Sequence, residues 1–154
     1  MRNGTFRTLP FFAQGMLENI GVAQAVNDML LTSHGYGLRL FPIWAALRPD
    51  ESASFATLRG KGAFLVSAEY NGVTRQVGNV TVVSEAGMLW RVLSPWVQRD
   101  VMVLFQAEGR EQGQALEPSL RLSPVMGWVE FATVSGGVYR LTPAAGPPGA
   151  DSLV

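Results

Sequence analysis

The chain has 154 residues, of which 47% are hydrophobic, and its 12 basic and 12 acidic residues give a formal net charge of zero. This size and composition fit one globular domain, or one domain with an extension, and the zero net charge gives no electrostatic reason to expect nucleic acid or an anionic membrane as a partner. The absence of cysteine excludes disulfides and cysteine-based metal sites or nucleophiles, and no apolar run approaches the roughly 20 residues of a membrane-spanning helix.

The first predicted element is a helix over residues 19–33. Apolar side chains recur there at the spacing of one helical face: Val22, Val26, Met29 and Leu30. Asn19 is expected to cap the N-terminus of this helix. Gly35 and Gly37 are expected to end it, because glycine readily adopts the left-handed conformation in which helices close. A helix this apolar needs a large surface to pack on, so we expect the chain to be the C-terminal part of a larger protein.

Without such a surface, the apolar face of this helix must lie on the rest of the chain, self-associate or stay exposed. Burial is worth about 1.5–3 kcal/mol for each large apolar side chain, against a total stability of about 5–15 kcal/mol for a typical domain. We therefore expect the isolated chain to oligomerise or to have poor solubility.

Residues 38–142 are predicted to form short strands separated by turns. In the clearest strand, alternation leaves Glu69 on the solvated face, and the opposite face is expected to carry Phe64, Val66, Ala68 and Tyr70. Asn71-Gly72 stands between this strand and a second one over residues 73–83, which predicts a hairpin with a two-residue type I′ turn. Gly78 in the second strand predicts a bulge or a close backbone approach.

The rest of the chain also alternates between strands and loops. Strands are predicted in residues 88–96 and 101–106, and loops in residues 45–54 and 108–119. A last hairpin is predicted from residues 129–134 and 138–141, joined around Gly136. Six or seven strands fit between residues 38 and 142, which is typical of a β-sandwich. The predicted fold class is therefore mainly β, a sandwich preceded by one α-helix.

Two stretches of the sequence resemble glycoside hydrolase family 95, which contains α-L-fucosidases and α-L-galactosidases. Residues 17–44 are similar to the end of the family's helical catalytic barrel and read LENIGVAQAVNDMLLTSHGYGLRLFPIW. Residues 55–72 are similar to the opening of the β-sandwich that follows the barrel and read FATLRGKGAFLVSAEYNG. The resemblance covers about residues 14–100 and includes VVSEAG at 82–87 and the pair Pro95-Trp96.

The resemblance implies a division of the chain into three segments. Residues 1–37 would be the end of an (α/α) barrel, residues 38–142 the C-terminal β-sandwich, and residues 143–154, rich in Pro and Gly, a disordered tail. The family hydrolyses its substrates with inversion, using a Glu as general acid and a base built from Asn residues and an Asp. By the resemblance, the acid and the Asn pair lie upstream of this chain, so carbohydrate would be bound by the parent enzyme.

Only the segment just before the last barrel helix would belong to the active site. Many family members read Asp-Gly-Asn there. Aligned on Met29-Leu30-Leu31, Asn19 matches the Asn, Glu18 stands at the Gly position and Leu17 at the Asp position. A leucine cannot polarise a water molecule, so we expect the chain alone to be inactive and to complete or stabilise the barrel. Its partner would be a separate chain that forms the rest of the barrel, or a second copy of this chain bound through the apolar helix.

Each candidate site residue also has a structural interpretation. Glu18 and Asn19 could contact a sugar, or could serve the N-terminus of the helix, where acidic and capping side chains are favourable. His34, the only histidine, could contact substrate or cap the end of the helix. Trp44 could stack on a sugar, as could the other three Trp residues, or pack against protein. A lone His without Cys makes no convincing zinc site, and no cofactor or metal is expected.

Two other functions stay open at this point. The chain could be a stand-alone carbohydrate-binding module that uses exposed Trp side chains, or an interaction module without a ligand. The compartment is also open, because a secreted or periplasmic parent would carry its signal in sequence that this chain does not include.

Overall fold

The computed structural model describes residues 11–33, 35–106 and 118–144. Helix α1 (Phe11–Leu30) is followed by two short paired strands, β1 (Leu31–Thr32) and β2 (Arg39–Leu40), and by a short helix, α2 (Trp44–Leu47). The remaining strands are β3 (Ala53–Gly60), β4 (Phe64–Asn71), β5 (Gln76–Ser84), β6 (Leu89–Leu93), β7 (Val101–Gln106), β8 (Pro118–Leu122), β9 (Trp128–Ala132) and β10 (Gly137–Pro143). The predicted tail from residue 145 onward, and most of the predicted loop at 108–119, lie outside the described residues.

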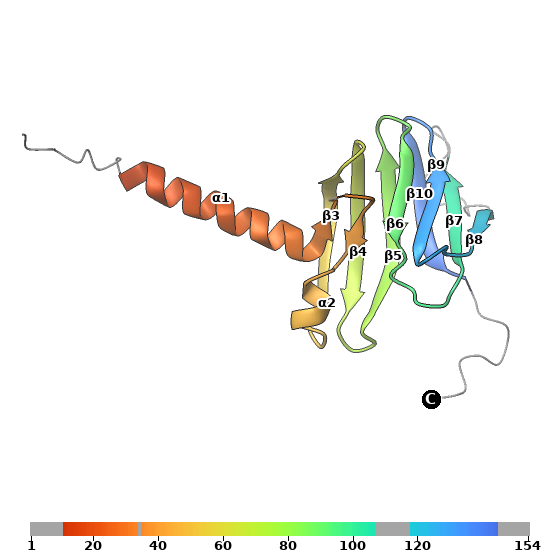
Figure 1. Ribbon diagram of the computed structural model, residues 1–154, viewed down its shortest axis with the longest axis horizontal. Coiled ribbons are helices and arrows are strands. Elements are labelled where there is room, and N and C mark those ends of the chain that lie inside the picture. Colours follow the sequence, from red (N-terminus) through yellow and green to blue (C-terminus); the bar gives the residue numbers. More distant parts are fainter. Residues whose placement is uncertain (1–10, 34, 107–117, 145–154) are drawn as a thin grey trace, which may run out of the picture.

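The protein is mainly β, with antiparallel sheets and one long N-terminal helix (Figure 1), which confirms the predicted fold class. The larger layer is a six-stranded sheet in the order β3-β4-β5-β10-β7-β8. The smaller layer is the pair β6-β9, extended by Leu38. The Leu38 amide donates to the Arg91 carbonyl at 2.9 Å, and the Leu38 carbonyl accepts from the Leu93 amide at 2.9 Å.

The core lies between these layers and follows the alternation of the strands. In β4 the side chains of Phe64, Val66, Ala68 and Tyr70 are buried and Glu69 is exposed, as predicted. The smaller layer contributes Trp90, which is fully buried and meets Phe64 edge to face, with 5.0 Å between ring centroids. Residues that precede β3 also enter this core: Leu31, Leu38, Leu40 and Phe41.

The hairpin formed by β4 and β5 is confirmed, but its turn is not the predicted type I′ turn. Pairing ends at Asn71 and Gln76, so residues 72–75 make the connection, and Arg75 has a positive φ of 53°. The Asn71 Oδ1 accepts hydrogen bonds from the amides of Val73 and Thr74, at 2.8 and 3.0 Å. These bonds form an Asx-type turn. Gly72 is required for space, because a Cβ there would lie 2.4 Å from the backbone of Asp50.

The bulge predicted at Gly78 is present, and the group that approaches Gly78 closely is a side chain instead of backbone. The register between β4 and β5 shifts between Ala68 and Tyr70, which pair with Val80 and Val77, so β5 contains a bulge around Gly78. A Cβ at Gly78 would lie 2.7 Å from Oε1 of Glu69. The glycine therefore allows the Glu69 side chain to lie across the bulge.

The predicted last hairpin is wrong. Strand β9 pairs with β6, whereas β10 pairs with β5 and β7, so the segment between them crosses from one layer to the other. The Gly136 amide donates to the Ser84 carbonyl at 2.8 Å, and the Val134 amide donates to the Tyr139 hydroxyl at 2.8 Å. A Gly-rich turn between two alternating strands fits both a hairpin and a corner between layers. Here β9 belongs to the smaller layer and β10 to the larger one, and each buries one face in the core between them.

The predicted bounds of the helix are also wrong, since it spans Phe11–Leu30 instead of residues 19–33. Asn19 lies inside α1, so it does not cap the N-terminus. The helix ends early because Leu31 pairs with Leu40 in β1 and β2, and the Leu30 carbonyl accepts from the Phe41 amide at 2.7 Å. The segment 45–54, predicted as a loop, contains most of α2 and the start of β3.

The central strand β10 supplies a test of this core. Leu141 is 1% exposed between the two layers, so Leu141→Ala should lower the free energy of unfolding by about 2–5 kcal/mol. Val73, 91% exposed in the β4–β5 turn, provides the control, and Val73→Ala should change stability by less than about 0.5 kcal/mol. Urea unfolding followed by Trp fluorescence measures both, and equal effects would contradict the described packing.

Candidate functional site

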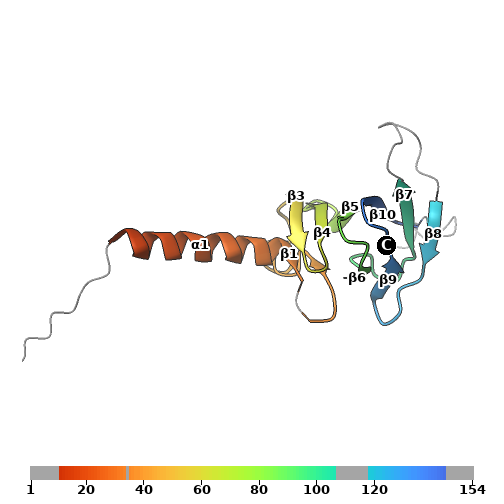
Figure 2. The same ribbon diagram turned by 90° about the horizontal axis from the view of Figure 1, so that it is seen from above.

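Helix α1 projects from one end of the sandwich instead of packing along it (Figures 1 and 2). All residues from Ile20 to Asn27 are exposed, and they cover every side of the helix. Among them are Ile20, Val22 and Val26, which are 57%, 65% and 46% exposed. Burial begins only at Asp28, one turn before the helix enters the sandwich. The sandwich therefore leaves the apolar face of α1 uncovered.

The residues that sequence analysis assigned to a sugar site are not brought together by the sandwich. Glu18 and Asn19 belong to α1, and this helix extends away from the sheets (Figures 1 and 2). Leu17 lies in the same helix. His34 lies outside the described residues. A catalytic site that used Glu18 and Asn19 would need its other groups from outside the sandwich.

Trp44, the fourth candidate, begins α2 and is half-buried. Its Nε1 donates to the Glu51 carbonyl at 2.9 Å, and the Arg48 guanidinium lies 5.8 Å from its ring centroid. Trp90 and Trp96 are buried, and Trp128 is half-buried against Arg91. All four Trp residues are described and none is exposed, so they do not form an open platform for stacking on a sugar.

Sequence analysis missed a cleft of about 600 Å³ across the ends of β3, β4 and β5. Its polar side chains are Ser52, Ser54, Glu69, Asn71, Thr74, Gln76 and Asn79. Glu69 is the only acidic side chain in this lining, whereas glycoside hydrolysis uses two carboxyl groups or an equivalent acid and base. The cleft has the donors and acceptors to hold a polar molecule but lacks the groups for hydrolysis.

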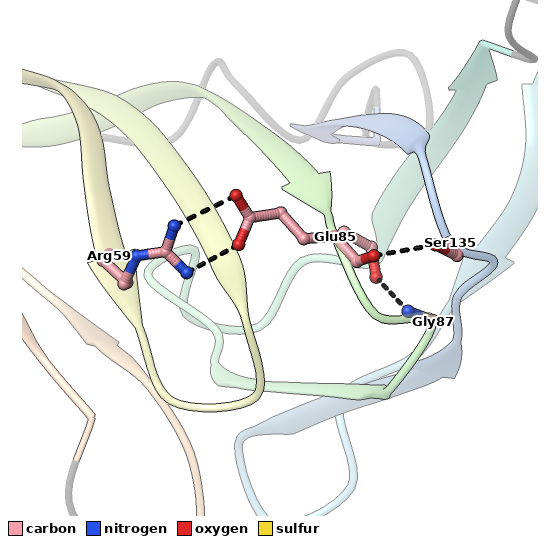
Figure 3. Close-up of polar contacts among 5 residues, drawn as sticks. Arg59, Glu85, Gly87 and Ser135 are labelled. Atoms are coloured by element: carbon pink, nitrogen blue, oxygen red, sulfur yellow. Dashed lines mark hydrogen bonds and ion pairs between the residues drawn. The ribbon is translucent and has the colours of Figure 1, made fainter.

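Figure 3 shows a polar cluster where the larger layer meets the turn between β5 and β6. Arg59 and Glu85 form a two-pronged ion pair, with nitrogen–oxygen distances of 2.6 and 3.0 Å. The hydrogen bonds that Arg59 donates to the Glu85 carboxylate, together with the negative charge of that carboxylate, raise the pKa of Arg59. The Glu85 carbonyl accepts from the Ser135 hydroxyl at 2.7 Å. The cluster links the edge strand β3 to the crossover before β10 and is a structural contact, because its charged groups satisfy each other.

A second polar cluster centres on Asp100. Its carboxylate accepts hydrogen bonds from the Arg121 Nε and the Ser123 hydroxyl, both at 2.7 Å, and its carbonyl accepts one from the Ala144 amide at 2.8 Å. The hydrogen bond from Ser123, followed by that from Arg121, lowers the pKa of Asp100. The cluster holds the start of β7, the end of β8 and the end of β10 together.

Within the described residues, no group of His, Cys, Asp or Glu side chains is arranged to hold a metal ion. The same part of the chain has no helix that is both long and apolar enough to cross a membrane. Neither a scan against models of protein families nor a search of curated protein sequences finds a match to the chain. The function is therefore proposed from the residues and the geometry described above.

The Asp100 cluster predicts a pH dependence of stability. Because the pKa of Asp100 is lower in the folded chain than in the unfolded chain, where Asp titrates near about 3.9, its stabilisation is present above that value and is lost as the pH falls through the folded pKa. Asp100→Asn should therefore lower the melting temperature at neutral pH, and this difference should shrink at acidic pH as Asp100 becomes protonated in the folded chain. Glu69→Gln, which removes an exposed carboxylate with no hydrogen-bond partner among the described residues, should match the unmodified protein at neutral and at acidic pH. An Asp100→Asn deficit that does not shrink at acidic pH would contradict the assignment.

Proposed function

We propose that the chain is the C-terminal part of a family-95-like glycoside hydrolase, in which α1 is the last helix of the catalytic barrel and the β-sandwich supports it. The observation that carries the proposal is the exposed apolar face of α1. Val22 and Val26, which lie four residues apart on one side of α1, are 65% and 46% exposed where the helix projects from the sandwich. Each would contribute about 1.5–3 kcal/mol if buried, so this helix is built to pack against further protein.

The resemblance of residues 17–44 and 55–72 to that family supports the same assignment. These two stretches correspond to α1 with β1, β2 and the start of α2, and to β3 with β4. The substrates of the parent enzyme would be α-L-fucosides or α-L-galactosides, hydrolysed with inversion. The acid and the Asn residues of the base would come from the upstream part of the barrel.

The sandwich has a definite role in this proposal, which is to fix the end of the barrel helix. Leu31 follows α1 directly and is buried in the core. The pairing of Leu31 with Leu40, and the hydrogen bond from the Phe41 amide to the Leu30 carbonyl, attach the end of the helix to the sandwich backbone. A helix held at one end in this way has a defined direction, which a catalytic barrel needs for the residues at its mouth.

A stand-alone carbohydrate-binding module has less support, because no Trp side chain is exposed. The polar cleft beside Glu69 offers hydrogen-bonding groups, but its aromatic member, Tyr70, is buried and donates its hydroxyl to the Pro49 carbonyl at 2.9 Å. An open aromatic ring for stacking on a sugar is therefore missing from that cleft.

The purified chain should not hydrolyse an aryl α-L-fucoside. The physical reason is that Glu69 stands alone in its cleft and that no group of the sandwich lies near Glu18 and Asn19. Release of the aryl group is followed by absorbance, with the boiled chain as control and Glu18→Gln as matched variant. Turnover above the boiled control that Glu18→Gln abolishes would overturn the expected inactivity.

The coding DNA upstream of Met1 tests the proposed parent. The proposal expects it to encode paired helices of a barrel, in frame or in a neighbouring frame, with an acidic residue in the active site. Expressed together with this chain, that segment should hydrolyse the same fucoside. An upstream region without such helices would contradict the proposed function.

A further inference from the structure

A second uncovered apolar surface lies on the outer side of the smaller layer. Two clefts, of about 220 and about 430 Å³, adjoin there, and Arg91 lines both. The loop between β1 and β2 and the loop between β8 and β9 flank this surface and extend to the same side of the molecule, towards the bottom of Figure 2. We call the surface between these loops the Arg91 groove.

Arg91 lies at the floor of the groove, where two aromatic rings and a carboxylate compensate its charge. The Arg91 guanidinium lies 5.8 Å from the ring centroid of Tyr36 and 5.1 Å from that of Trp128, and its Nε lies 2.5 Å from Oε1 of Glu130. A Cβ at Gly37 would lie 2.7 Å from the Trp128 ring, so glycine allows the loop to approach it. Cation–π contacts and the ion pair with Glu130 thus compensate the charge of Arg91 in the centre of the groove.

Apart from Ser33, Lys61, Ser123 and Glu130, the side chains that line the rest of the groove are apolar or aromatic. The exposed ones among them are Tyr36 (81%), Met88 (54%), Leu89 (60%), Val125 (73%) and Met126 (94%). Aromatic residues, Met and Arg are the residue types enriched at protein interfaces, and Trp, Tyr and Arg dominate their binding energy. Aliphatic side chains without spare hydrogen-bonding groups fit apolar side chains better than a sugar.

Helix α1 has the complementary properties. Val22 and Val26 are exposed on one side of α1, and the sequence of α1 contains two acidic residues, Glu18 and Asp28, and no basic one. The groove includes Lys61, which has no ion-pair partner among the described residues and can pair with an acidic side chain of α1. Because α1 projects away from its own sandwich (Figures 1 and 2), it does not lie in the groove of the same chain. The α1 of another copy is free to do so.

We propose that two copies of this chain form a two-fold dimer in which α1 of each copy lies in the Arg91 groove of the other. This is helix-in-groove recognition, and the exchange is reciprocal, so the assembly closes instead of forming a fibre. The inference does not rest on the proposed function, because it requires only the exposed helix and the groove. It states where α1 packs in the isolated chain.

Sedimentation equilibrium tests the dimer with the full chain. The unmodified protein should sediment at twice its mass of 16.7 kDa. Val22→Lys on α1 and Met126→Asp in the groove should each weaken association by roughly ten-fold or more, as loss of a central interface contact does. Gln24→Lys is the control for Val22→Lys, because it adds a positive charge on the other side of the helix. Val73→Asp is the control for Met126→Asp, because it adds a negative charge at an exposed turn outside the groove. Both controls should remain dimeric.

A monomeric unmodified chain would overturn the inference, and so would a dimer that Met126→Asp leaves intact. Cooperative urea unfolding of each variant shows whether it is folded. A monomer would leave the proposed function standing, because that proposal is tested by turnover and by the upstream coding sequence.

Cross-linking separates the groove from other arrangements without relying on the stability of the charged variants. The chain contains no cysteine, so Val22→Cys and Met126→Cys introduce single thiols. With a flexible bis-maleimide linker, a mixture of the two variants should give a cross-linked heterodimer, and each variant alone should give little product. Strong cross-linking of Val22→Cys alone would show that the two α1 helices pack on each other, which would overturn the proposed site.

Discussion

The unequal width of the two layers governs the rest of the structure. The six-stranded sheet presents a wide inner face, and β6 and β9 cover only part of it. Residues before β3 complete the cover, with Leu38 paired beside β6 and with Leu31, Leu40 and Phe41 buried in the same core. The Phe41 ring lies 5.2 Å from Phe55 and 5.8 Å from Tyr70, between centroids. The segment from Leu31 to Phe41 is therefore part of the sandwich, and the point at which α1 leaves it is fixed by the packing of the core.

This anchoring explains how a helix with exposed apolar residues stays in one direction. Among residues 20–30 of α1, the last turn is partly buried and the rest is exposed. The strand pairing that follows this turn determines where the helix points. The consequence for chemistry is that Glu18 and Asn19 are held away from the sheets. The sandwich can position these residues for a catalytic site but cannot complete one, because its own cleft beside Glu69 has a single carboxylate. The proposed barrel and the proposed dimer are two ways to cover the same face of the helix, and they exclude each other at that face.

Features that depend on neighbouring residues could be predicted from the sequence, whereas features that depend on distant contacts could not. The alternation in β4 and the bulge at Gly78 are local and were predicted correctly. The type of the turn after Asn71 was predicted wrongly. Glycine at position 72 is selected by the close approach of Asp50, which belongs to a distant segment. The last hairpin was wrong because β9 and β10 carry the same alternation whether they pair with each other or face each other across a core. The start of the helix was predicted too late because residues 1–16 show no clear helical periodicity.

The Arg91 groove illustrates the same limit for sites. Tyr36, Arg91 and Trp128 belong to a loop and two strands that are far apart in the sequence, and none of them follows a motif. The register of Arg91 with Glu130 between β6 and β9 places the ion pair at the centre of the surface, and Gly37 lets the loop with Tyr36 approach Trp128. Once the guanidinium is paired and covered on both sides by rings, its charge no longer repels apolar side chains. An arginine in this setting therefore serves as a flat, apolar part of the surface, and this makes an otherwise polar position suitable for receiving a helix.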